Sequence, residues 1–273
     1  MFQAPVRKSK ARSGFAMLEL IFHITVRNLR KSSGSAVMGL LLSILQALIM
    51  IGMFLLMFSL LGMRSAAIRG DYTLYLMSGI FMFTTHVRTI SSVSKAEGPT
   101  SPMMKHSTMN PIVVIMGAAL ASLYQQVFAA AVILFVYDAL ISPLTFDQPV
   151  QAMGMLLLGW GTGLGVGMIF KALMPWNPTA FTMISSIYQR LNMIASGKMF
   201  VANMMPTSLL AMFDWNPLFH VIDQGRGFIF LNYNPRYSSI EYPIKVMLVC
   251  IVIGLMGEFY TRKFASLSWT AGK

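Results

Sequence analysis

The sequence is short of cysteine and of charged side chains. Cys250 is the single cysteine among 273 residues, so the chain cannot form an intrachain disulfide. Only 11% of the residues are charged, whereas a soluble globular domain carries about 25%. Because 56% of the residues are hydrophobic and the mean hydropathy is +0.64, the sequence predicts an integral membrane protein.

Several motifs that carry chemistry are also absent. The Gly-Lys pairs at 197–198 and 272–273 lack the upstream glycine of a phosphate-binding G-x-x-x-x-G-K-[ST] loop. The sequence contains no H-E-x-x-H zinc motif, no C-x-x-C pair and no G-x-S-x-G nucleophile motif. We therefore expect a chain that is not an enzyme and that holds no metal or cofactor of its own.

A basic cytoplasmic tail, residues 1–13, precedes an amphipathic segment, residues 14–32. On a helix, the polar residues of this segment form one stripe, because they recur at three- and four-residue spacing. These residues are Glu19, His23, Arg27, Arg30 and Lys31. The pattern predicts an interfacial helix that lies in the membrane plane with its cations near anionic headgroups. An amphipathic helix packed on protein is the alternative.

Six apolar segments reach the roughly 20 residues that a membrane-spanning helix needs. They are Ser35–Gly62, Tyr72–Ser92, Ile112–Tyr137, Val150–Phe170, Thr179–Gly197 and Tyr242–Tyr260. The sequence therefore predicts an all-α integral membrane protein. Its six-span transmembrane domain covers residues 33–265, and a cytoplasmic tail follows at 266–273.

The net charge of +12 follows this predicted topology. When the N-terminus is placed in the cytoplasm, the outer segments contain as many acids as cations, and nearly all of the excess Lys and Arg is cytoplasmic. This distribution obeys the positive-inside rule, so both termini are predicted to be cytoplasmic. The charge therefore needs no nucleic-acid partner to explain it.

The fifth segment, Thr179–Gly197, has a polar face. Its polar side chains recur at three- and four-residue steps, and Arg190 lies near mid-span, off that face. The polar residues are Thr182, Ser185, Ser186, Gln189, Asn192 and Ser196. Polar groups at this depth face protein or water, so two interpretations stay open: hydrogen bonds between helices, or a hydrated path for a polar solute.

Other segments add polar groups to such a path. Gln46, Gln125 and Gln126 lie at mid-depth, and Arg88 lies toward the inner end of the second segment. Arg88 could attract an anionic solute or extend its guanidinium to the membrane surface. The predicted path residues are Gln46, Arg88, Ser185, Gln189, Arg190, Asn192 and Ser196.

The fourth segment contains glycine at every second position from Gly159 to Gly167. On a helix, this spacing includes small residues four apart, which let another helix approach closely. A dinucleotide-binding loop is excluded, because no strand and no later acidic ribose partner accompany the glycines. The pattern therefore predicts a helix-packing surface.

Residues 198–241 lie outside the membrane in this topology but are too apolar for a loop in water. Their apolar halves, 199–215 and 217–222, are each too short to span. We expect a pair of short re-entrant helices, broken at 215–217, that line protein or a water-filled cavity as an outer lid or vestibule. The residues that mark this segment are Trp215, Asn216, Pro217, His220, Asp223 and Arg226.

A cytoplasmic loop at 95–111 joins the second and third segments. Its prolines leave room for one or two helical turns, with Ser101 as N-cap and Pro102 at the first helical position. Such an element could transmit force to a soluble partner, and a plain connector is the alternative. The candidate contact residues are Glu97, Pro99, Pro102, Met103, Lys105 and His106.

Taken over residues 15–265, these features resemble the permease subunit of type-2 ABC exporters, and within them the capsular polysaccharide export permeases. The similar features are the interfacial helix, the six spans, the short cytoplasmic element and the stretch "WNPLFHVIDQGRGF" before the sixth span. Its most specific part is Asn216-Pro217-Leu218 with His220 and Arg226. The remaining architecture fits O-antigen and teichoic acid exporters nearly as well.

The resemblance implies a homodimer in the bacterial inner membrane that pairs with two copies of a separate ABC ATPase. That partner would bind ATP and Mg, and the loop at 95–111 would be the coupling helix that contacts it. The implied substrate is a lipid-linked capsular polysaccharide, which periplasmic and outer-membrane export proteins would then receive.

Two other classes of function stay open. A membrane-embedded enzyme acting on lipid-linked sugars would use His23, His86, His106 or His220 with nearby acids. Three of these histidines fall at cytoplasmic or inner-end positions and one falls outside, so they do not converge easily. The other class is a purely structural membrane subunit. The sequence carries no carbohydrate-recognition motif and so does not name the polysaccharide.

Overall fold

A computed structural model describes residues 10–31, 34–60, 62, 68, 70–98 and 110–264 of the chain. These residues form helices joined by loops, with no strand among them, so the predicted all-α fold class is confirmed. The helices are α1 (Lys10–Lys31), α2 (Ala36–Leu60), α3 (Tyr72–Ser94), α5 (Pro111–Leu140), α6 (Pro149–Leu173), α7 (Pro178–Ala195), η1 (Ala202–Met204), α8 (Thr207–Leu210), α9 (Pro217–Ile229) and α10 (Glu241–Phe264).

In the described part of the chain, four helices are long and apolar enough to cross a membrane: α2, α5, α6 and α10. The chain is therefore a helical membrane protein, as its composition predicts. Helices α3 and α7 form at the positions of the second and fifth expected spans but fall outside this group. Helix α3 carries many hydroxyl side chains, and α7 carries both hydroxyl and amide side chains, which lower their hydropathy.

Helix α3 forms the centre of the bundle and is buried along most of its length. It packs against α2, α5, α6 and α9. Its hydroxyl groups need no solvent, because Thr84, Thr85 and Thr89 donate hydrogen bonds of 2.8, 2.7 and 2.7 Å to carbonyl oxygens of the preceding turn. These threonine hydroxyls are therefore satisfied inside the helix, whereas Tyr72 Oη and His86 Nε2 of α3 are buried without a hydrogen-bond partner in the described part of the chain.

Helix α6 packs between α3 and α10, and its glycines lie at both contacts. A Cβ atom at Gly163 would lie 2.6 Å from the carbonyl oxygen of His86 on α3. A Cβ atom at Gly165 would lie 2.8 Å from the Cβ atom of Cys250 on α10. Larger residues would separate the helix backbones, so the predicted helix-packing surface is confirmed.

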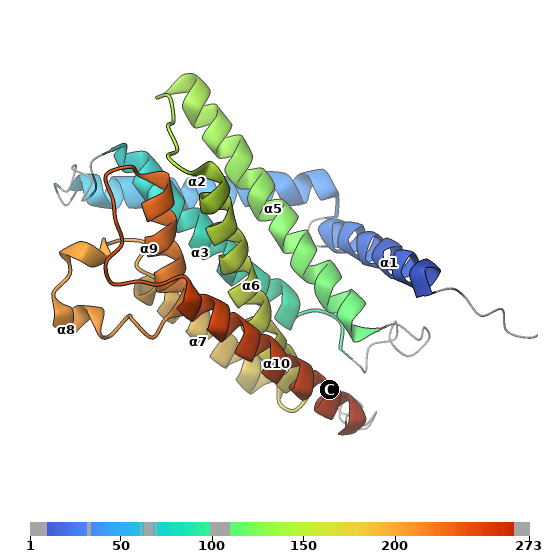
Figure 1. Cartoon of the computed structure of the whole chain (residues 1–273). Coiled ribbons are helices and arrows are strands. Elements are labelled where there is room, and N and C mark those ends of the chain that lie inside the picture. The colour runs from blue at the N-terminus through green and yellow to red at the C-terminus, as the bar shows by residue number, and fades with distance from the viewer. Residues whose placement is uncertain are drawn as a thin grey trace, which may run out of the picture.

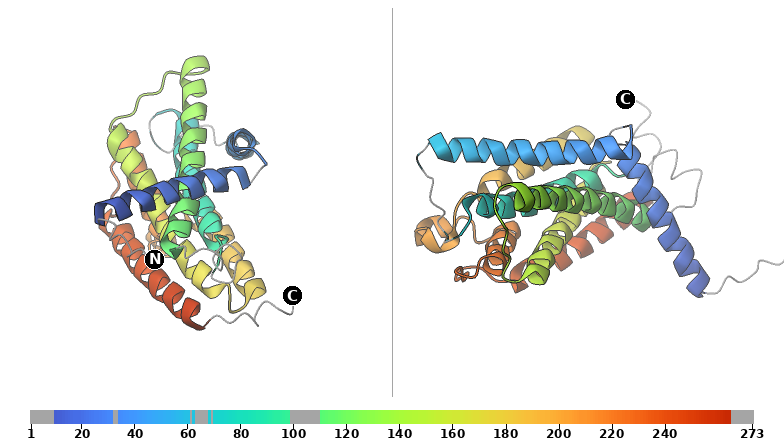
Figure 2. Two further views of the ribbon diagram at one scale, coloured as in Figure 1. Left: turned by 90° about the vertical axis from the view of Figure 1, so that its right-hand side faces the viewer. Right: turned by 90° about the horizontal axis from the view of Figure 1, so that it is seen from above.

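The long helices run between two ends of the bundle (Figures 1 and 2). Helix α1 and the C-terminal end of α10 lie at one end, and α8 and α9 lie at the other. We call the first the basic end, because the following cations gather there: Arg27, Arg30, Lys31, Lys95, Lys171, Arg262 and Lys263. The two ends of the bundle are therefore chemically different.

Helix α1 begins at Lys10, four residues before the predicted start, and packs against α5. The contact is close, because a Cβ atom at Gly117 of α5 would lie 2.5 Å from Ile24 Cγ2. Away from this contact, α1 exposes Phe15 and Phe22. One face of α1 therefore packs on protein, as in the alternative interpretation of this amphipathic segment. Attachment of its exposed face to the membrane surface remains a prediction.

A buried ion pair joins α6 to α10 at the basic end. Lys171 Nζ lies 3.2 and 3.3 Å from the two carboxylate oxygens of Glu258. Nearby, Trp176 Nε1 donates a 2.9 Å hydrogen bond to Thr261 Oγ1, which itself donates to the carbonyl oxygen of Ala172 at 2.8 Å. Both helices are thus fixed to each other where they reach the basic end.

Candidate functional site

Helix α9 lies among α3, α6 and α10 and carries most of the residues that mark the predicted re-entrant segment. All of the marked residues except Trp215 are buried. With 13 residues, α9 is about 20 Å long and too short to span. Before it, η1 and α8 have only three and four residues, and Pro206 lies between them, where it cannot continue a helix from the preceding turn.

Asn216 joins the start of α9 to the end of α7. Its Oδ1 atom caps α9 by accepting a 3.0 Å hydrogen bond from Leu218 N. Its Nδ2 atom donates 2.9 Å hydrogen bonds to Asn192 Oδ1 and to the carbonyl oxygen of Ala195. Pro217 follows at the first helical position, where no N–H is needed. The Asn216 amide is therefore used entirely in positioning the helix.

Both ring nitrogens of His220 bond to backbone groups. Nε2 donates to the carbonyl oxygen of Asp214 at 2.7 Å, and Nδ1 accepts from Ser239 N at 3.1 Å. This pattern assigns the neutral tautomer with its proton on Nε2, since a carbonyl oxygen can only accept and an N–H can only donate. Nε2 also lies 3.3 Å from the Asp214 carboxylate oxygen Oδ1, so both ring nitrogens are engaged in contacts that fix the start of α9 to the loop before α10.

The Asp223 carboxylate fastens the loop before α10 to α9. It accepts hydrogen bonds from the hydroxyl groups of Tyr233 and Ser238, the latter at 2.7 Å. Burial, and then the negative charge of Asp223, raise the pKa of the Tyr233 phenol. The phenol therefore stays protonated and remains a hydrogen-bond donor to the carboxylate.

Arg226 extends from α9 to the turn that follows α7. Its Nη1 atom donates hydrogen bonds to the carbonyl oxygens of Gly197 and Phe200 at 2.9 and 2.7 Å. Its Nη2 atom donates to the carbonyl oxygen of Lys198 at 2.6 Å. The guanidinium carbon lies 4.1 Å from the centre of the Tyr75 ring, a cation–π contact with α3. Arg226 thus holds three segments together.

Lys198 is a buried cation that the predicted topology places in an outer segment. It is 2% exposed, and its ammonium group has no hydrogen-bond partner in the part of the chain that the structure describes. The Nζ atom lies 3.6 Å from the centre of the Phe83 ring and 5.1 Å from that of Phe54. The only sequence signal at this position is a Ser-Gly-Lys stretch, which is too short to indicate a buried cation.

The predicted path residues in and directly after α7 lie on two different faces of that helix. Ser185, Asn192 and Ser196 are buried, and Gln189 donates a 3.1 Å hydrogen bond to Ser185 Oγ. Asn192 also accepts the hydrogen bond from α9 described above. Within one copy of the chain, this face therefore contacts protein and makes the hydrogen bonds of the first interpretation.

Arg190 lies on the opposite, exposed face of α7. It shares this face with Met183, Ile187 and Ile194, which are 65%, 44% and 64% exposed and recur at three- and four-residue steps around it. In the described ranges of the chain, no acid forms an ion pair with Arg190. A guanidinium therefore stands in an apolar surface.

Gln46 and Arg88, the remaining path residues, lie close together. They line a cavity of about 110 Å³ between α2, α3 and α5, with Ser43, Thr84 and Gln126. The α7 residues do not line this cavity. The structure thus separates the predicted path residues into this cluster, the α7–α9 junction and the isolated Arg190.

Of the candidate coupling residues, Glu97 lies in the described part of the chain. Its Oε1 atom accepts hydrogen bonds from Arg27 Nη2 and from Lys31 Nζ, the latter at 3.5 Å. Both partners belong to α1, so Glu97 ties the end of α3 to that helix. The other coupling candidates, Pro99, Pro102, Met103, Lys105 and His106, lie outside the described residues.

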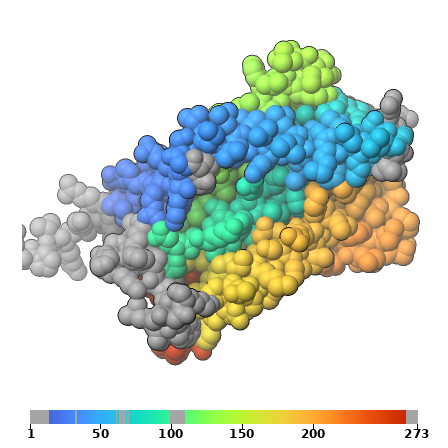
Figure 3. All heavy atoms as spheres, turned by 180° about the vertical axis from the view of Figure 1, so that it is seen from behind, coloured from blue at the N-terminus to red at the C-terminus, as the bar shows by residue number. Residues whose placement is uncertain are grey.

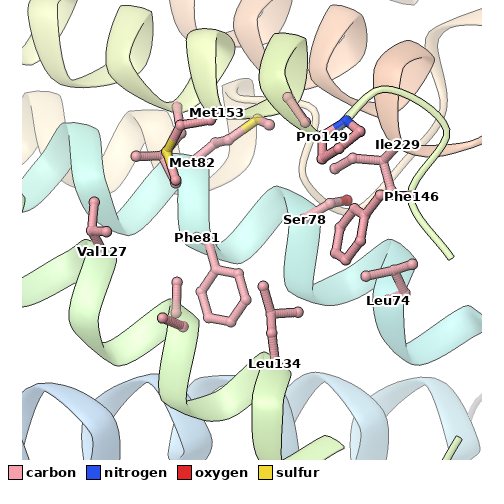
Figure 4. Close-up of a pocket in the computed structure, with 14 residues that line it drawn as sticks. Leu74, Ser78, Phe81, Met82, Val127, Leu134, Phe146, Pro149, Met153 and Ile229 are labelled. Atoms are coloured by element: carbon pink, nitrogen blue, oxygen red, sulfur yellow. The ribbon is translucent and has the colours of Figure 1, made fainter. Parts of the chain in front are cut away.

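An apolar cavity of about 270 Å³ lies between α3, α5, α6 and the end of α9. Figure 4 shows Phe81, Leu134, Met82 and Met153 among the side chains that line it. The hydroxyl group of Ser78, its polar side chain, already donates to the carbonyl oxygen of Tyr75 at 2.7 Å. This cavity therefore offers space for apolar groups and no group for catalysis or ion binding.

The histidines do not converge. His86 is buried, with Nδ1 at 3.1 Å from the carbonyl oxygen of Gly159, whereas His23 is exposed beside Glu19. His106 lies outside the described residues. In the ranges that the structure does describe, no three His, Cys, Asp or Glu side chains gather to hold a metal ion. The described histidines therefore do not share one site.

Helices α2 (blue) and α7 (yellow) lie on the same face of the molecule, separated by a strip of α3 (Figure 3). Both expose long apolar side chains, such as Leu41, Leu45 and Met53 on α2.

No protein-family model matches the chain, and no match was found among the curated proteins. The residues of the chain itself are therefore the basis for a functional proposal.

Proposed function

We propose that the chain is the permease subunit of an ATP-driven ABC exporter that moves a lipid-linked polysaccharide across the bacterial inner membrane. A separate subunit would hydrolyse ATP, since the sequence has no phosphate-binding loop. The bundle of long helices, the amphipathic α1 and the buried α9 support this proposal. It also agrees with the sequence resemblance to type-2 exporter permeases.

In this proposal, α3 and α7 join α2, α5, α6 and α10 as membrane-spanning helices. Helix α3 is enclosed by protein, and α7 buries most of its polar path residues against α9 and the core, so neither must present these groups to lipid. The basic end would be cytoplasmic, with α1 at the inner membrane surface. Helix α9 would be re-entrant in the outer half, where protein surrounds its backbone.

Arg190 is the observation that carries the transport proposal. An arginine at the centre of a spanning helix costs about 2.5–3.5 kcal/mol on insertion scales. No described acid neutralises Arg190, and its helical neighbours on that face are apolar except for Ser186, whose hydroxyl donates to the carbonyl oxygen of Thr182. Water or a charged solute beside α7 would remove this cost, and either would require a polar path along this face.

A second copy of the chain would enclose that path. One bundle is too narrow to surround a polysaccharide, so we place the conduit at a two-fold interface that includes α2 and α7, which share one face (Figure 3). Single cysteines along the exposed side of α7, introduced into Cys250→Ser protein, should cross-link between copies. A strictly monomeric particle that transports actively would contradict this arrangement.

The basic end is the proposed docking site for two copies of the ATPase. Glu97 already fixes the end of α3 to α1 there, so a push on the 95–111 loop would reach α1 and α3 together. Such a junction suits a coupling element better than a plain connector. ATP and Mg would remain entirely in the partner subunit.

The acidic or phosphate-bearing character of the solute is inferred from Arg190, because a guanidinium binds carboxylates and phosphates in bidentate fashion. The assignment to capsular polysaccharide rests on the sequence resemblance. An O-antigen or teichoic acid exporter is the alternative. Periplasmic and outer-membrane export proteins would be further partners only in the capsular case.

The proposal is tested by co-expression with an ABC ATPase encoded beside this chain. We expect the two proteins to co-purify at equal stoichiometry in mild detergent, and the chain to change the rate of ATP hydrolysis by the ATPase. The catalytically inactive ATPase should still bind but should give no hydrolysis. Absence of complex with each neighbouring ATPase would sink the exporter proposal.

A further inference from the structure

A polar cavity of about 340 Å³ lies at the basic end, between α1, α3 and α5. Each helix contributes one face, because the lining residues recur at three- and four-residue steps. Among them are Arg27 and Lys31 from α1, Arg88, Ser91 and Lys95 from α3, and Gln125 from α5. The volume falls within the roughly 300–1,000 Å³ that is usual for small-ligand sites.

The cavity has an excess of positive charge. Glu97 is the single acid among the described residues that line it, and it accepts hydrogen bonds from Arg27 and Lys31. Arg88 and Lys95 line the same space and have no ion pair with any described residue. One carboxylate cannot neutralise four cations, so an anion would be attracted to this cavity.

Neutral donors face the same space. The side chains of Asn28, Ser91 and Gln125 line the cavity and make no hydrogen bond with the described part of the chain. Phosphate oxygens only accept hydrogen bonds, and a guanidinium such as that of Arg88 can donate two in parallel to them. A phosphate group would thus satisfy the charge and the donors together.

In the proposed topology, with the basic end at the inner membrane surface, the cavity would lie at the depth of the lipid headgroups. Arg88 is about 9 Å along α3 from Ser94 at 1.5 Å per residue, and α5 is one of the apolar helices able to cross a membrane. Apolar side chains also line the cavity, among them Ile24 and Val114. A ligand with a phosphate and an adjoining apolar part therefore fits better than a fully hydrated anion.

From this geometry we infer a binding site for the phosphate headgroup of an anionic membrane phospholipid. Arg88 and Lys95 bind the phosphate, Asn28 and Gln125 donate to its oxygens or to the glycerol backbone, and the acyl chains leave along α1 and α5. The site does not depend on the export function, since it requires only a bilayer. A free phosphate ion has the same headgroup chemistry, so the test must separate the two sources.

The test uses the full-length protein in neutral maltoside micelles with fluorescent phosphatidylglycerol as the probe. We expect unlabelled phosphatidylglycerol to displace the probe, and phosphatidylcholine and inorganic phosphate to do so about tenfold less well. The double variant Arg88→Gln/Lys95→Gln should bind the probe about tenfold or more weakly, because it loses two charge-assisted contacts. Ser91→Leu, which keeps every charge but fills the cavity, should also weaken binding.

Two controls keep the result specific. Arg262→Gln/Lys263→Gln removes two exposed cations from the same end of the bundle without touching the cavity, and should bind as wild type does. Each variant is compared by thermal unfolding and gel filtration to show that it is folded. Equal displacement by phosphatidylcholine, equal displacement by inorganic phosphate, or unchanged binding by the Arg88/Lys95 double variant would each overturn the inference.

Discussion

Arg226 Nη2 donates a 2.6 Å hydrogen bond to the backbone carbonyl oxygen of Lys198, so one buried cation contacts the backbone of a second buried cationic residue. No described acid forms an ion pair with either of them. Backbone carbonyls hold the guanidinium, and the Phe83 ring lies 3.6 Å below the ammonium. The turn after α7 is therefore fixed to α9 and α3 by carbonyl dipoles and aromatic rings.

The first prediction concerns Arg226→Gln. The variant leaves carbonyl oxygens of the 197–200 turn without their donors in a buried site. We expect it to lower the free energy of unfolding by about 2–5 kcal/mol. Thermal unfolding in mild detergent measures this loss. Arg236→Gln is the matched control, because Arg236 is exposed in the same outer segment, and it should change stability by less than about 0.5 kcal/mol.

A second prediction concerns the space that α3 leaves for Arg226. A Cβ atom at Gly79 would lie 2.9 Å from Arg226 Nη2 and 3.0 Å from Lys198 Cβ. Gly79→Ala should therefore destabilise the protein by about 1–3 kcal/mol, although alanine is the better helix former. Gly154→Ala on α6 has nothing within 4 Å and should be neutral or stabilising.

The two sites should also be coupled. Gly79→Ala displaces the guanidinium that Arg226→Gln removes, so the double variant should lose less stability than the sum of the single losses. Strict additivity would show that the alanine acts elsewhere on α3.

The long helices could be predicted from hydrophobic runs, because each run depends only on the sequence of that helix. The expected segment Ile112–Tyr137 became α5, Pro111–Leu140, and Val150–Phe170 became α6, Pro149–Leu173. The glycine spacing in α6 predicted close packing but could not name α3 and α10 as its partners. That six helices span the membrane remains a prediction, since composition alone identifies four of them.

The site was less predictable, because its contacts join distant segments. The hydrogen-bond acceptors of Arg226 lie between 26 and 29 residues earlier in the chain. Periodicity placed Ser185 and Asn192 on one face of α7, yet only the packing of α9 shows that this face contacts protein. The sequence places Lys198 in an outer segment but does not predict that its side chain is buried, because a single lysine in a polar turn carries no sign of burial.

A third prediction concerns the buried pair between α6 and α10. Glu258→Gln leaves the Lys171 ammonium buried without its counter-charge, and should cost about 3–5 kcal/mol of stability. The double variant Lys171→Met/Glu258→Leu removes both charges and should regain most of that loss. If the double variant is as unstable as Glu258→Gln, the cost arises from packing and not from the unpaired charge.

The fourth prediction concerns Arg190, which the transport proposal places beside a hydrated path. Arg190→Gln should reach the membrane at the wild-type level, because the side chain is exposed and makes no ion pair with described residues. It should nevertheless export poorly. Arg190→Lys should recover only part of the activity, because an ammonium group lacks the planar, two-pronged donor geometry of a guanidinium. Protein level and surface polysaccharide are measured on the same cells, with Lys245→Gln as the control.

Low protein together with low export in the Arg190→Gln cells would assign this residue a structural role. Wild-type export with wild-type protein would remove it from the conduit altogether.

Reconstituted transport tests the central proposal most directly. Proteoliposomes contain this chain with its co-purified ATPase, and the measurement follows a labelled lipid-linked acidic polysaccharide as it becomes protected from an added glycosidase. The account predicts protection that requires ATP, the ATPase and this chain together, and that falls at least about tenfold with Arg190→Gln, the equivalent of one charge-assisted contact. Equal ATP-dependent protection in vesicles that lack this chain would contradict it.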